Sequence, residues 1–233
     1  LSNSLGTDLT MWDDQASAFA GHFRLIRYDR RGHGQSGAPK GPYSFDRFGR
    51  DILGVLDALG VKKTNWCGVS MGGMDGQWLG ANPPDHIEKL VLANTHYHYA
   101  DKAPWADRLR FLEQHPLNDL VVANMERWFT KGFRERAPQT IARMTKMFVA
   151  TNHAGYAACV AAVRDIDFRA SNPTIRTPTL VIVGARDPAT PPAAGETIAK
   201  VIPGARLVTL DAAHISNVEQ PQAFTKAVLD FLQ

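Results

Sequence analysis

The chain has 233 residues, 44% of them hydrophobic, and a formal net charge of +3 from 26 Lys and Arg against 23 Asp and Glu. These values predict one domain with at most an inserted subdomain, and they exclude a nucleic-acid-binding surface, which needs a larger and more concentrated positive charge. No stretch is apolar over a membrane-spanning length, no signal peptide is visible, and the two cysteines lack metal-ligand spacing, so we predict a cytoplasmic protein without membrane partner, metal or disulfide.

Taken in chain order, strand and helix patterns alternate along most of the sequence. Residues 1–7 are typical of the end of a strand that opens into a polar loop. The strands predicted after it have alternating or continuous apolar residues and cover residues 23–28, 65–69, 89–94, 179–184 and 206–210. The predicted helices have apolar residues three or four positions apart and cover residues 12–20, 45–59, 71–82, 195–201 and 222–232. This alternation predicts an α/β fold with a mostly parallel sheet and helices on both of its faces.

The alternation stops in the middle of the chain. From residue 96 to residue 171, strand patterns disappear and the apolar residues follow helical spacing. We therefore predict a helical cap over residues 96–171, inserted into a core that is formed by residues 1–95 and 172–233.

A Gly-x-Ser-x-Gly motif, Gly-Val-Ser-Met-Gly, occupies residues 68–72 between a predicted strand and a predicted helix. In a nucleophile elbow the chain turns so sharply there that the serine, here Ser70, is exposed above the sheet edge. Glycines on both sides let backbone approach backbone, and the N–H of Met71 would lie at a helix N-terminus, where it stabilises an oxyanion. The motif alone is equally compatible with a glycine-rich turn in which the serine only caps the helix.

Two further residues are placed beside Ser70 by the predicted sheet. Ligands of parallel sheets bind at the carboxyl ends of the strands. Asp187 follows the strand predicted over residues 179–184, and His214 follows the strand predicted over residues 206–210. The chain order Ser, Asp, His is that of α/β-hydrolases. We therefore predict a serine nucleophile, a histidine base and an aspartate that orients the histidine.

Other residues compete for these roles. His33 is the rival base, but it lies in a glycine-containing turn that suggests a structural loop. Asp29 and Asp211 also lie near strand ends, and we interpret both as turn residues. Taken singly, Asp187 is compatible with a turn residue and His214 with a loop histidine. The agreement of three placements favours the triad.

Several motifs together resemble one known family. They are Leu-Ser-Asn-Ser-Leu-Gly-Thr at residues 1–7, Tyr-Asp-Arg-Arg-Gly-His-Gly-Gln-Ser at 28–36, Gly-Val-Ser-Met-Gly-Gly at 68–73, Leu-Val-Leu-Ala-Asn-Thr at 90–95, Glu-Arg-Trp-Phe-Thr at 126–130 and Asp-Ala-Ala-His-Ile-Ser-Asn-Val-Glu-Gln-Pro at 211–221. Over nearly its whole length the chain resembles the 3-oxoadipate enol-lactonases, a family of α/β-hydrolases.

The resemblance implies hydrolysis of an enol-lactone in the β-ketoadipate pathway of aromatic-acid catabolism, without cofactor or metal. It implies the same three triad residues, and an oxyanion hole made by the N–H of Met71 with that of Ser4, or less favourably Leu5. It also implies two strands before the one that ends near Leu1, so we expect about 20 to 30 further residues upstream.

The substrate that the resemblance implies is a small anionic lactone, because an enol-lactone of this pathway carries a free carboxylate. The pocket then needs a cation or hydrogen-bond donor, for which the basic residues of the cap are candidates. Trp128 is the candidate wall of the pocket, with core packing as its alternative.

Two departures from the family and three other functions stay open. Asp75 stands where relatives have an apolar residue, and it is expected either to be tolerated near the positive helix end or to face the cap. Residues 96–101 are unusually rich in His and Tyr and are expected to reshape the pocket. The same triad also suits a general carboxylesterase or a carbon–carbon bond hydrolase. In another class, a ligand receptor would keep the pocket but turn over negligibly.

Overall fold

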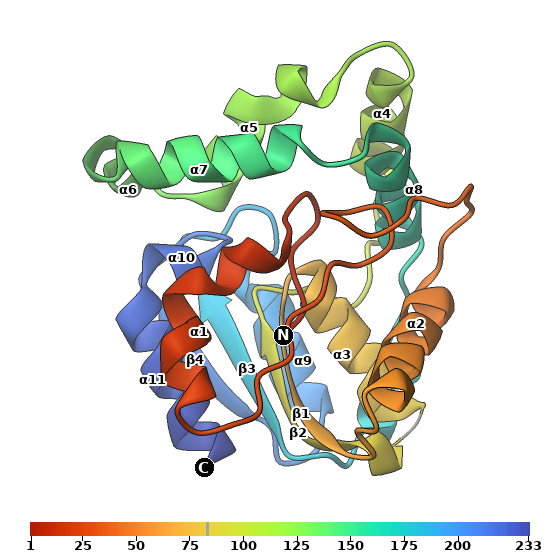
Figure 1. Cartoon of the computed structure of the whole chain (residues 1–233), viewed down its shortest axis with the longest axis vertical. Coiled ribbons are helices and arrows are strands. Elements are labelled where there is room, and N and C mark those ends of the chain that lie inside the picture. Colours follow the sequence, from red (N-terminus) through yellow and green to blue (C-terminus); the bar gives the residue numbers. More distant parts are fainter. Residues whose placement is uncertain (83) are drawn as a thin grey trace.

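The computed structural model describes residues 1–82 and 84–233 (Figure 1). Its strands are β1 (Thr64–Val69), β2 (Ile87–Ala93), β3 (Thr179–Gly184) and β4 (Arg206–Leu210). Its α-helices are α1 (Asp13–Ala20), α2 (Phe45–Ala58), α3 (Met71–Ala81), α4 (Ala103–Leu112), α5 (Val121–Trp128), α6 (Lys131–Arg136), α7 (Pro138–Val149), α8 (His153–Arg164), α9 (Pro192–Val201), α10 (Ser216–Glu219) and α11 (Pro221–Leu232). Short 3₁₀ helices cover Leu9–Trp12, Pro84–His86, Leu117–Leu120 and Asn172–Thr174.

The four strands form one parallel sheet in the order β1-β2-β3-β4. One row of the sheet pairs Cys67 with Val91, Val91 with Leu180, and Leu180 with Arg206. Because every strand runs in the same direction, all four carboxyl ends lie at one edge of the sheet. This edge brings together segments that are far apart in the sequence.

Each face of the sheet has its own apolar core, because successive strand residues point to opposite faces. Leu90 and Val181 belong to the core that includes residues of α2, α3 and α9, whereas Val91 and Leu180 belong to the core that includes residues of α1 and α11. A strand covered on both faces must be apolar at nearly every position. This is why β2 and β3 were recognisable as nearly continuous apolar runs, and the predicted α/β class with a parallel sheet between layers of helices is confirmed.

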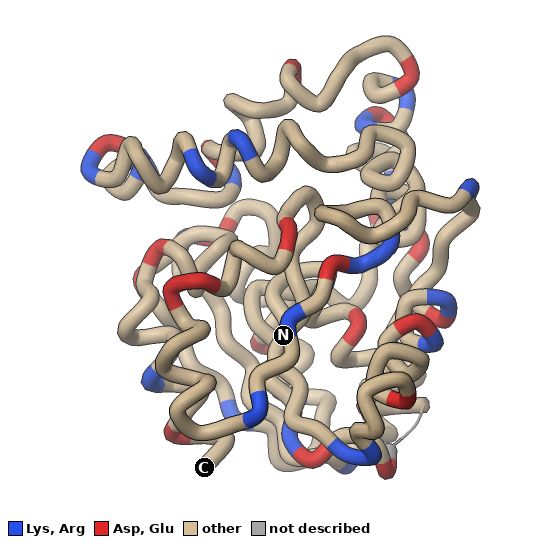
Figure 2. Tube along the Cα trace, viewed as in Figure 1, with Lys and Arg blue, Asp and Glu red and all other residues tan. Residues whose placement is uncertain are grey.

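Helices α4 to α8 follow β2 and lie over the carboxyl edge of the sheet (Figure 1). Helix α4 packs on α8, and α5 packs on α7. Their buried apolar faces, with Met125 and Phe148 among them, join the core on one face of the sheet. Lys and Arg are interspersed with Asp and Glu along the trace (Figure 2). The division into a core and a separate cap over residues 96–171 stays a prediction.

One predicted strand is wrong. Residues 23–28 have no assigned strand structure, although the amine of Leu1 donates to the carbonyl of Ile26 (2.7 Å) and Nδ2 of Asn3 donates to that of Tyr28 (3.1 Å). Alternating apolar residues favour an extended backbone, but a strand also needs a partner along its length. The short helix α10 was not predicted. In the described part of the chain, no helix is long and apolar enough to cross a membrane.

Candidate active site

Ser70 lies at the turn between β1 and α3, in a backbone conformation that L-amino acids rarely adopt. Its φ is +58° and its ψ is −113°. Two hydrogen bonds hold this conformation: the N–H of Ser70 donates to the carbonyl of Ala93 (2.8 Å), and the side-chain hydroxyl of Thr95 donates to the carbonyl of Ser70 (2.7 Å). Strained backbone at a sharp turn between a strand and a helix is the geometry expected of a nucleophile elbow.

Steric constraints explain why both positions of the motif are glycine. A Cβ on Gly68 would overlap the backbone of Gly72, and a Cβ on Gly72 would overlap the backbone of Ser2. Ser2 in turn pairs with the end of β1, since its N–H donates to the carbonyl of Cys67 (3.0 Å) and its carbonyl accepts from the N–H of Val69 (3.2 Å). The glycines therefore allow helix α3 and the first residues of the chain to approach the same strand.

The side chains of His214 and Asp187 meet at the carboxyl edge of the sheet, with 2.9 Å between Nδ1 and Oδ2. The carboxylate also accepts the N–H groups of Ala189 (2.8 Å) and Thr190 (3.0 Å) and the hydroxyl of Thr190 (2.7 Å). Burial raises the pKa of Asp187, but His214 and these hydrogen bonds lower it more, so the pKa lies below its ordinary value. The carboxylate is therefore ionised at neutral pH and can orient the imidazole.

Asn94, which directly follows β2, was not singled out from the sequence. Its φ is +45°, a conformation that Asn tolerates better than most residues. Its Nδ2 donates to Oδ2 of Asp187 and to the carbonyl of Ala213 (both 3.1 Å), and its Oδ1 accepts from the hydroxyl of Ser216 (2.5 Å). Asn94 thereby links the ends of three strands behind the Asp187 carboxylate. A polar residue directly after a buried strand is the signal that could have identified it.

Ser70 and His214 line one small pocket, together with Ser4, Leu5 and Trp128. The structure thus brings the predicted nucleophile, base and pocket wall together at one place. No hydrogen bond joins the hydroxyl of Ser70 to the ring of His214 within the described residues. Such contacts are often long without substrate and tighten when it binds.

Backbone donors for an oxyanion are available beside Ser70. Met71 is the first residue of α3, so its N–H has no acceptor within the helix. The N–H groups of Ser4 and Leu5 also donate to no acceptor in the described chain, whereas the next one, from Gly6, donates to Nε2 of His33 (2.9 Å). The choice of Ser4 and Met71 as the oxyanion hole stays a prediction.

His33 has a structural role and not a catalytic one, as its position in a glycine-containing turn suggested. Burial lowers the pKa of His33 to about 3, so the imidazole is neutral and accepts the hydrogen bond from Gly6. His33 therefore supports the loop that carries Ser4, and the geometry does not favour it as the base.

Asp75 forms a buried ion pair with a residue outside the predicted cap. Its Oδ2 accepts from Nη2 of Arg30 (2.8 Å) and from the hydroxyl of Ser2 (2.9 Å). The same Nη2 donates to the carbonyl of Asn3 (2.9 Å). The exposed fractions of the two charged side chains are only 3% for Arg30 and 0% for Asp75. The pair therefore joins helix α3 to the segment that precedes Ser4, and the expectation that Asp75 faces the cap is wrong.

We expect Asp75→Asn to lower the free energy of unfolding by about 3 to 5 kcal/mol, because it leaves the Arg30 charge buried without its partner. The double variant Asp75→Leu, Arg30→Met removes both charges and is expected to be less destabilised than the single variant. Urea unfolding followed by circular dichroism measures both free energies. A double variant less stable than Asp75→Asn would contradict this interpretation of the pair.

The His- and Tyr-rich segment at residues 96–101 packs beside the site. The ring of His96 stacks on those of Tyr97 and Tyr99, and its Nδ1 accepts the N–H groups of Tyr97 (3.1 Å) and His98 (3.2 Å). Burial lowers the pKa of His96 to about 4. The residues that line the Ser70 pocket do not include this segment, and the expected reshaping of the pocket stays a prediction.

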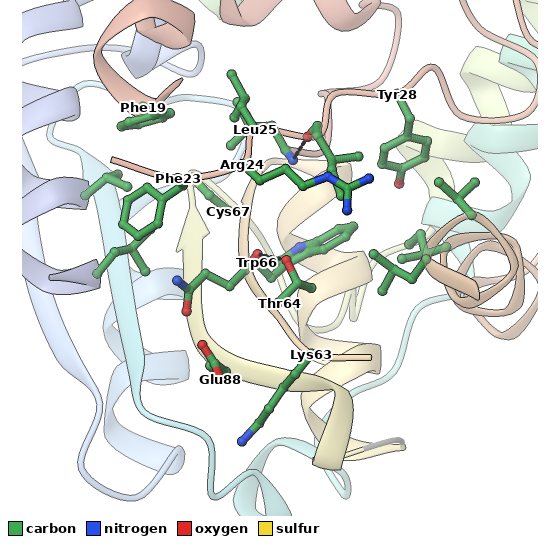
Figure 3. Close-up of a pocket in the computed structure, with 18 residues that line it drawn as sticks. Phe19, Phe23, Arg24, Leu25, Tyr28, Lys63, Thr64, Trp66, Cys67 and Glu88 are labelled. Carbon is green, nitrogen blue, oxygen red and sulfur yellow. Dashed lines mark hydrogen bonds between the residues drawn. The ribbon is translucent and has the colours of Figure 1, made fainter. Parts of the chain in front are cut away.

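A second cavity, of about 220 Å³, is lined by residues of β1, α2 and α11 and of the segment 23–28 (Figure 3). Apolar side chains such as Phe19, Leu25 and Trp66 form much of its wall. It is larger than the Ser70 pocket, at about 30 Å³, but no member of the candidate triad lines it. Among the residues described, no three His, Cys, Asp or Glu side chains are grouped as metal ligands. The absence of a metal or cofactor stays a prediction.

Comparison with known proteins places this geometry in a family. The family model for the α/β hydrolase fold matches residues 3–221. 3-Oxoadipate enol-lactonase 2 from Acinetobacter baylyi is 40% identical over 227 residues, which cover 97% of this chain and 85% of that protein. The crystal structure of the enol-lactonase from Burkholderia xenovorans LB400 matches with a TM-score of 0.97 and 45% identity, covering 99% of this chain and 89% of that one. A protein from Caulobacter sp. (strain K31), provisionally named carbamate hydrolase RutD, is 31% identical to this chain. The match covers 100% of this chain and 89% of that protein. The chain therefore belongs to the α/β-hydrolase fold family, and its resemblance to the 3-oxoadipate enol-lactonases is confirmed.

Proposed function

We propose that the chain hydrolyses 3-oxoadipate enol-lactone to 3-oxoadipate through an acyl-enzyme. The observation that carries the proposal is a strained Ser70 that shares one pocket with the buried His214–Asp187 pair. The relatives named as enol-lactonases, at 40% and 45% identity, support this choice of substrate. We also propose that the protein acts in the cytoplasm and needs no cofactor or metal.

In the proposed first step, Ser70 attacks the lactone carbonyl while Nε2 of His214 takes the hydroxyl proton. Asp187 accepts a hydrogen bond from Nδ1–H of His214. This keeps the imidazole in the tautomer whose Nε2 can accept a proton. The N–H groups of Met71 and Ser4 stabilise the oxyanion. The ring C–O bond then breaks, and the ring oxygen leaves as an enolate, which is a better leaving group than an alkoxide.

In the second step the protonated His214 delivers its proton to the departing enolate, which tautomerises to the ketone. The same imidazole then removes a proton from water as the water attacks the acyl carbonyl. Cleavage of the ester to Ser70 releases 3-oxoadipate and restores the serine hydroxyl. Each proton that His214 accepts is returned within the cycle, so the reaction needs only the lactone and water.

The proposed substrate is anionic. 3-Oxoadipate has two carboxylates, and ring closure uses one of them in the lactone ester, so the other stays free. The pocket lining includes Arg108 and Arg127, two permanently charged cations. A small anionic lactone is therefore the proposed partner.

A panel of substrates tests the proposal against its alternatives. We expect the highest kcat/KM for the enol-lactone, with smaller values for an aryl ester, a vinylogous diketone and a carbamate. Preference for the aryl ester would favour a general carboxylesterase, and preference for the diketone would favour a carbon–carbon bond hydrolase. Preference for the carbamate would favour the activity for which the Caulobacter relative is named. Addition of a chelator checks the proposed independence from metal, since it should leave the rate unchanged.

A further inference from the structure

His214 lies in an irregular loop between β4 and α10, so its backbone belongs to neither a strand nor a helix. Groups from outside the loop hold the backbone on both sides of it. From the sheet, Nδ2 of Asn94 donates to the carbonyl of Ala213 (3.1 Å). Toward helix α5, the N–H of Ile215 donates to the carbonyl of Trp128 (3.1 Å). The position of the imidazole therefore depends on contacts that other segments of the chain supply.

Glu219 supplies a further contact of this kind. It is the last residue of α10, and only 4% of its surface is exposed. Its Oε2 accepts the N–H of Ala213 (2.9 Å), the residue directly before His214. Its Oε1 accepts the N–H of Thr130 (3.3 Å) and also the Thr130 hydroxyl. One buried side chain thus joins the His214 loop to the segment between α5 and α6.

The segment that Glu219 contacts also belongs to the pocket. Trp128, which ends α5, lines the same pocket as Ser70 and His214. Thr130 is the N-cap of α6. The base and the wall of the pocket are therefore attached to the same few residues of the chain.

A buried carboxyl group is a costly way to join two segments if it serves stability alone, because its burial is unfavourable unless donors surround it. What it adds is direction, since its two oxygens accept from donors that lie in fixed places. Base catalysis needs this precision, because the histidine must lie within hydrogen-bond reach of the serine hydroxyl. A misplacement of about 1 Å can lower the rate about a hundredfold.

We propose that Glu219 is a positioning residue for His214, which holds the base and the wall of the pocket in one fixed arrangement. This inference rests on the proposed function, because it assigns how the base of that reaction is held. Among the described residues, the Glu219 side chain bonds to Ala213 and Thr130 and not to the imidazole, whose Nδ1 bonds to Asp187. Glu219 therefore acts through the backbone of the loop.

Glu219→Gln tests the positioning role. An amide has one accepting oxygen, so it cannot accept at both the Ala213 end and the Thr130 end. We expect kcat for the enol-lactone to fall by about ten- to a hundredfold and KM to stay nearly unchanged, since Glu219 does not line the pocket. The matched control is Glu196→Gln, the same change at an exposed position of α9, which should alter neither constant. A folded Glu219→Gln with the wild-type kcat would overturn the proposal.

Thr130 provides a second test, which holds even where Glu219→Gln fails to fold. Thr130→Val removes the hydroxyl that donates to Glu219 and keeps the shape of the side chain, whereas Thr130→Ser keeps the hydroxyl. We expect Thr130→Val to lower kcat without raising KM and Thr130→Ser to retain the wild-type values. An unchanged kcat in Thr130→Val would contradict the role of this contact.

The double variant Glu219→Gln, Thr130→Val shows whether the two residues act through one contact. We expect its kcat to lie close to that of Glu219→Gln, because neighbouring residues that share an interaction are not additive. Losses that multiply would show that the two residues act independently, and would overturn the proposed connection. All variants are measured well below the Tm of each, so that a loss of folded protein does not contribute.

Labelling of Ser70 with a fluorophosphonate separates failure of the positioning role from failure of the proposed function, because it needs no lactone. The serine oxygen bonds to phosphorus, fluoride leaves, and His214 takes the hydroxyl proton. We expect Glu219→Gln to slow labelling by about ten- to a hundredfold and Glu196→Gln to leave it unchanged. Lactone turnover by the wild type, with labelling that Glu219→Gln does not slow, would overturn the positioning role and keep the function. Absent lactone turnover, with labelling that Glu219→Gln slows, would support the positioning role and overturn the function.

Discussion

Ser70→Ala is expected to lower kcat/KM for the enol-lactone by on the order of a millionfold, because the serine oxygen forms the covalent bond of the acyl-enzyme. His214→Ala should cost about as much. The double variant should lose little more than either single variant, since a nucleophile and its base act as one unit. Steady-state ring opening, followed by absorbance, measures all three.

The control for Ser70→Ala is Ser17→Ala, which makes the same change on the exposed face of α1. Circular dichroism and the Tm establish that each variant is folded. Alanine has the same steric restriction at positive φ as serine, so we expect Ser70→Ala to keep the elbow and the wild-type Tm. A folded Ser70→Ala that keeps more than a small fraction of the activity would contradict the nucleophile assignment.

Asp187→Asn is expected to lower kcat/KM by about ten-thousandfold. The Asp187 carboxylate accepts from Nδ1 of His214 and from several donors around it. An amide presents an N–H where a lone pair is needed, so it favours the imidazole tautomer that carries its proton on Nε2. That tautomer cannot take the proton from Ser70.

Asp211→Asn is the matched control for Asp187→Asn. Asp211 follows the neighbouring strand β4, and its side chain is 72% exposed and paired with Arg186. We expect its kcat/KM to stay close to that of the wild type, because it does not line the Ser70 pocket. Equal losses in the two variants would show that acids at this edge act through general charge and not through the histidine tautomer.

Much of the fold was predictable because it rests on local patterns. Buried parallel strands are apolar at nearly every position, so β2 and β3 stand out in the sequence. The rule that ligands bind at the carboxyl ends of strands then placed Asp187 and His214 near each other before any distance was known. The role of the glycines at positions 68 and 72 was equally predictable. The turn brings backbone segments so close together that only glycine fits at these positions.

What escaped prediction depends on partners that are distant in the sequence. Asp75 is paired with Arg30, 45 residues away, and neither residue carries a local sign of the other. Asn94 reaches Asp187 across 93 residues. Residues 23–28 have a strand-like pattern, but a sequence pattern does not show whether a neighbouring strand is present to form hydrogen bonds with them. Among the basic residues of the cap, only the assembled pocket distinguishes the two that line it, Arg108 and Arg127.

The most direct test of the central claim counts product molecules per enzyme molecule. The purified wild-type chain is mixed with a large excess of 3-oxoadipate enol-lactone, and the 3-oxoadipate formed is quantified after the spontaneous hydrolysis seen with Ser70→Ala has been subtracted. We predict product in large excess over enzyme, formed at a constant rate until the lactone is depleted. Product that stops at one molecule per chain or fewer would contradict a turnover enzyme and would favour a ligand receptor built on a hydrolase fold.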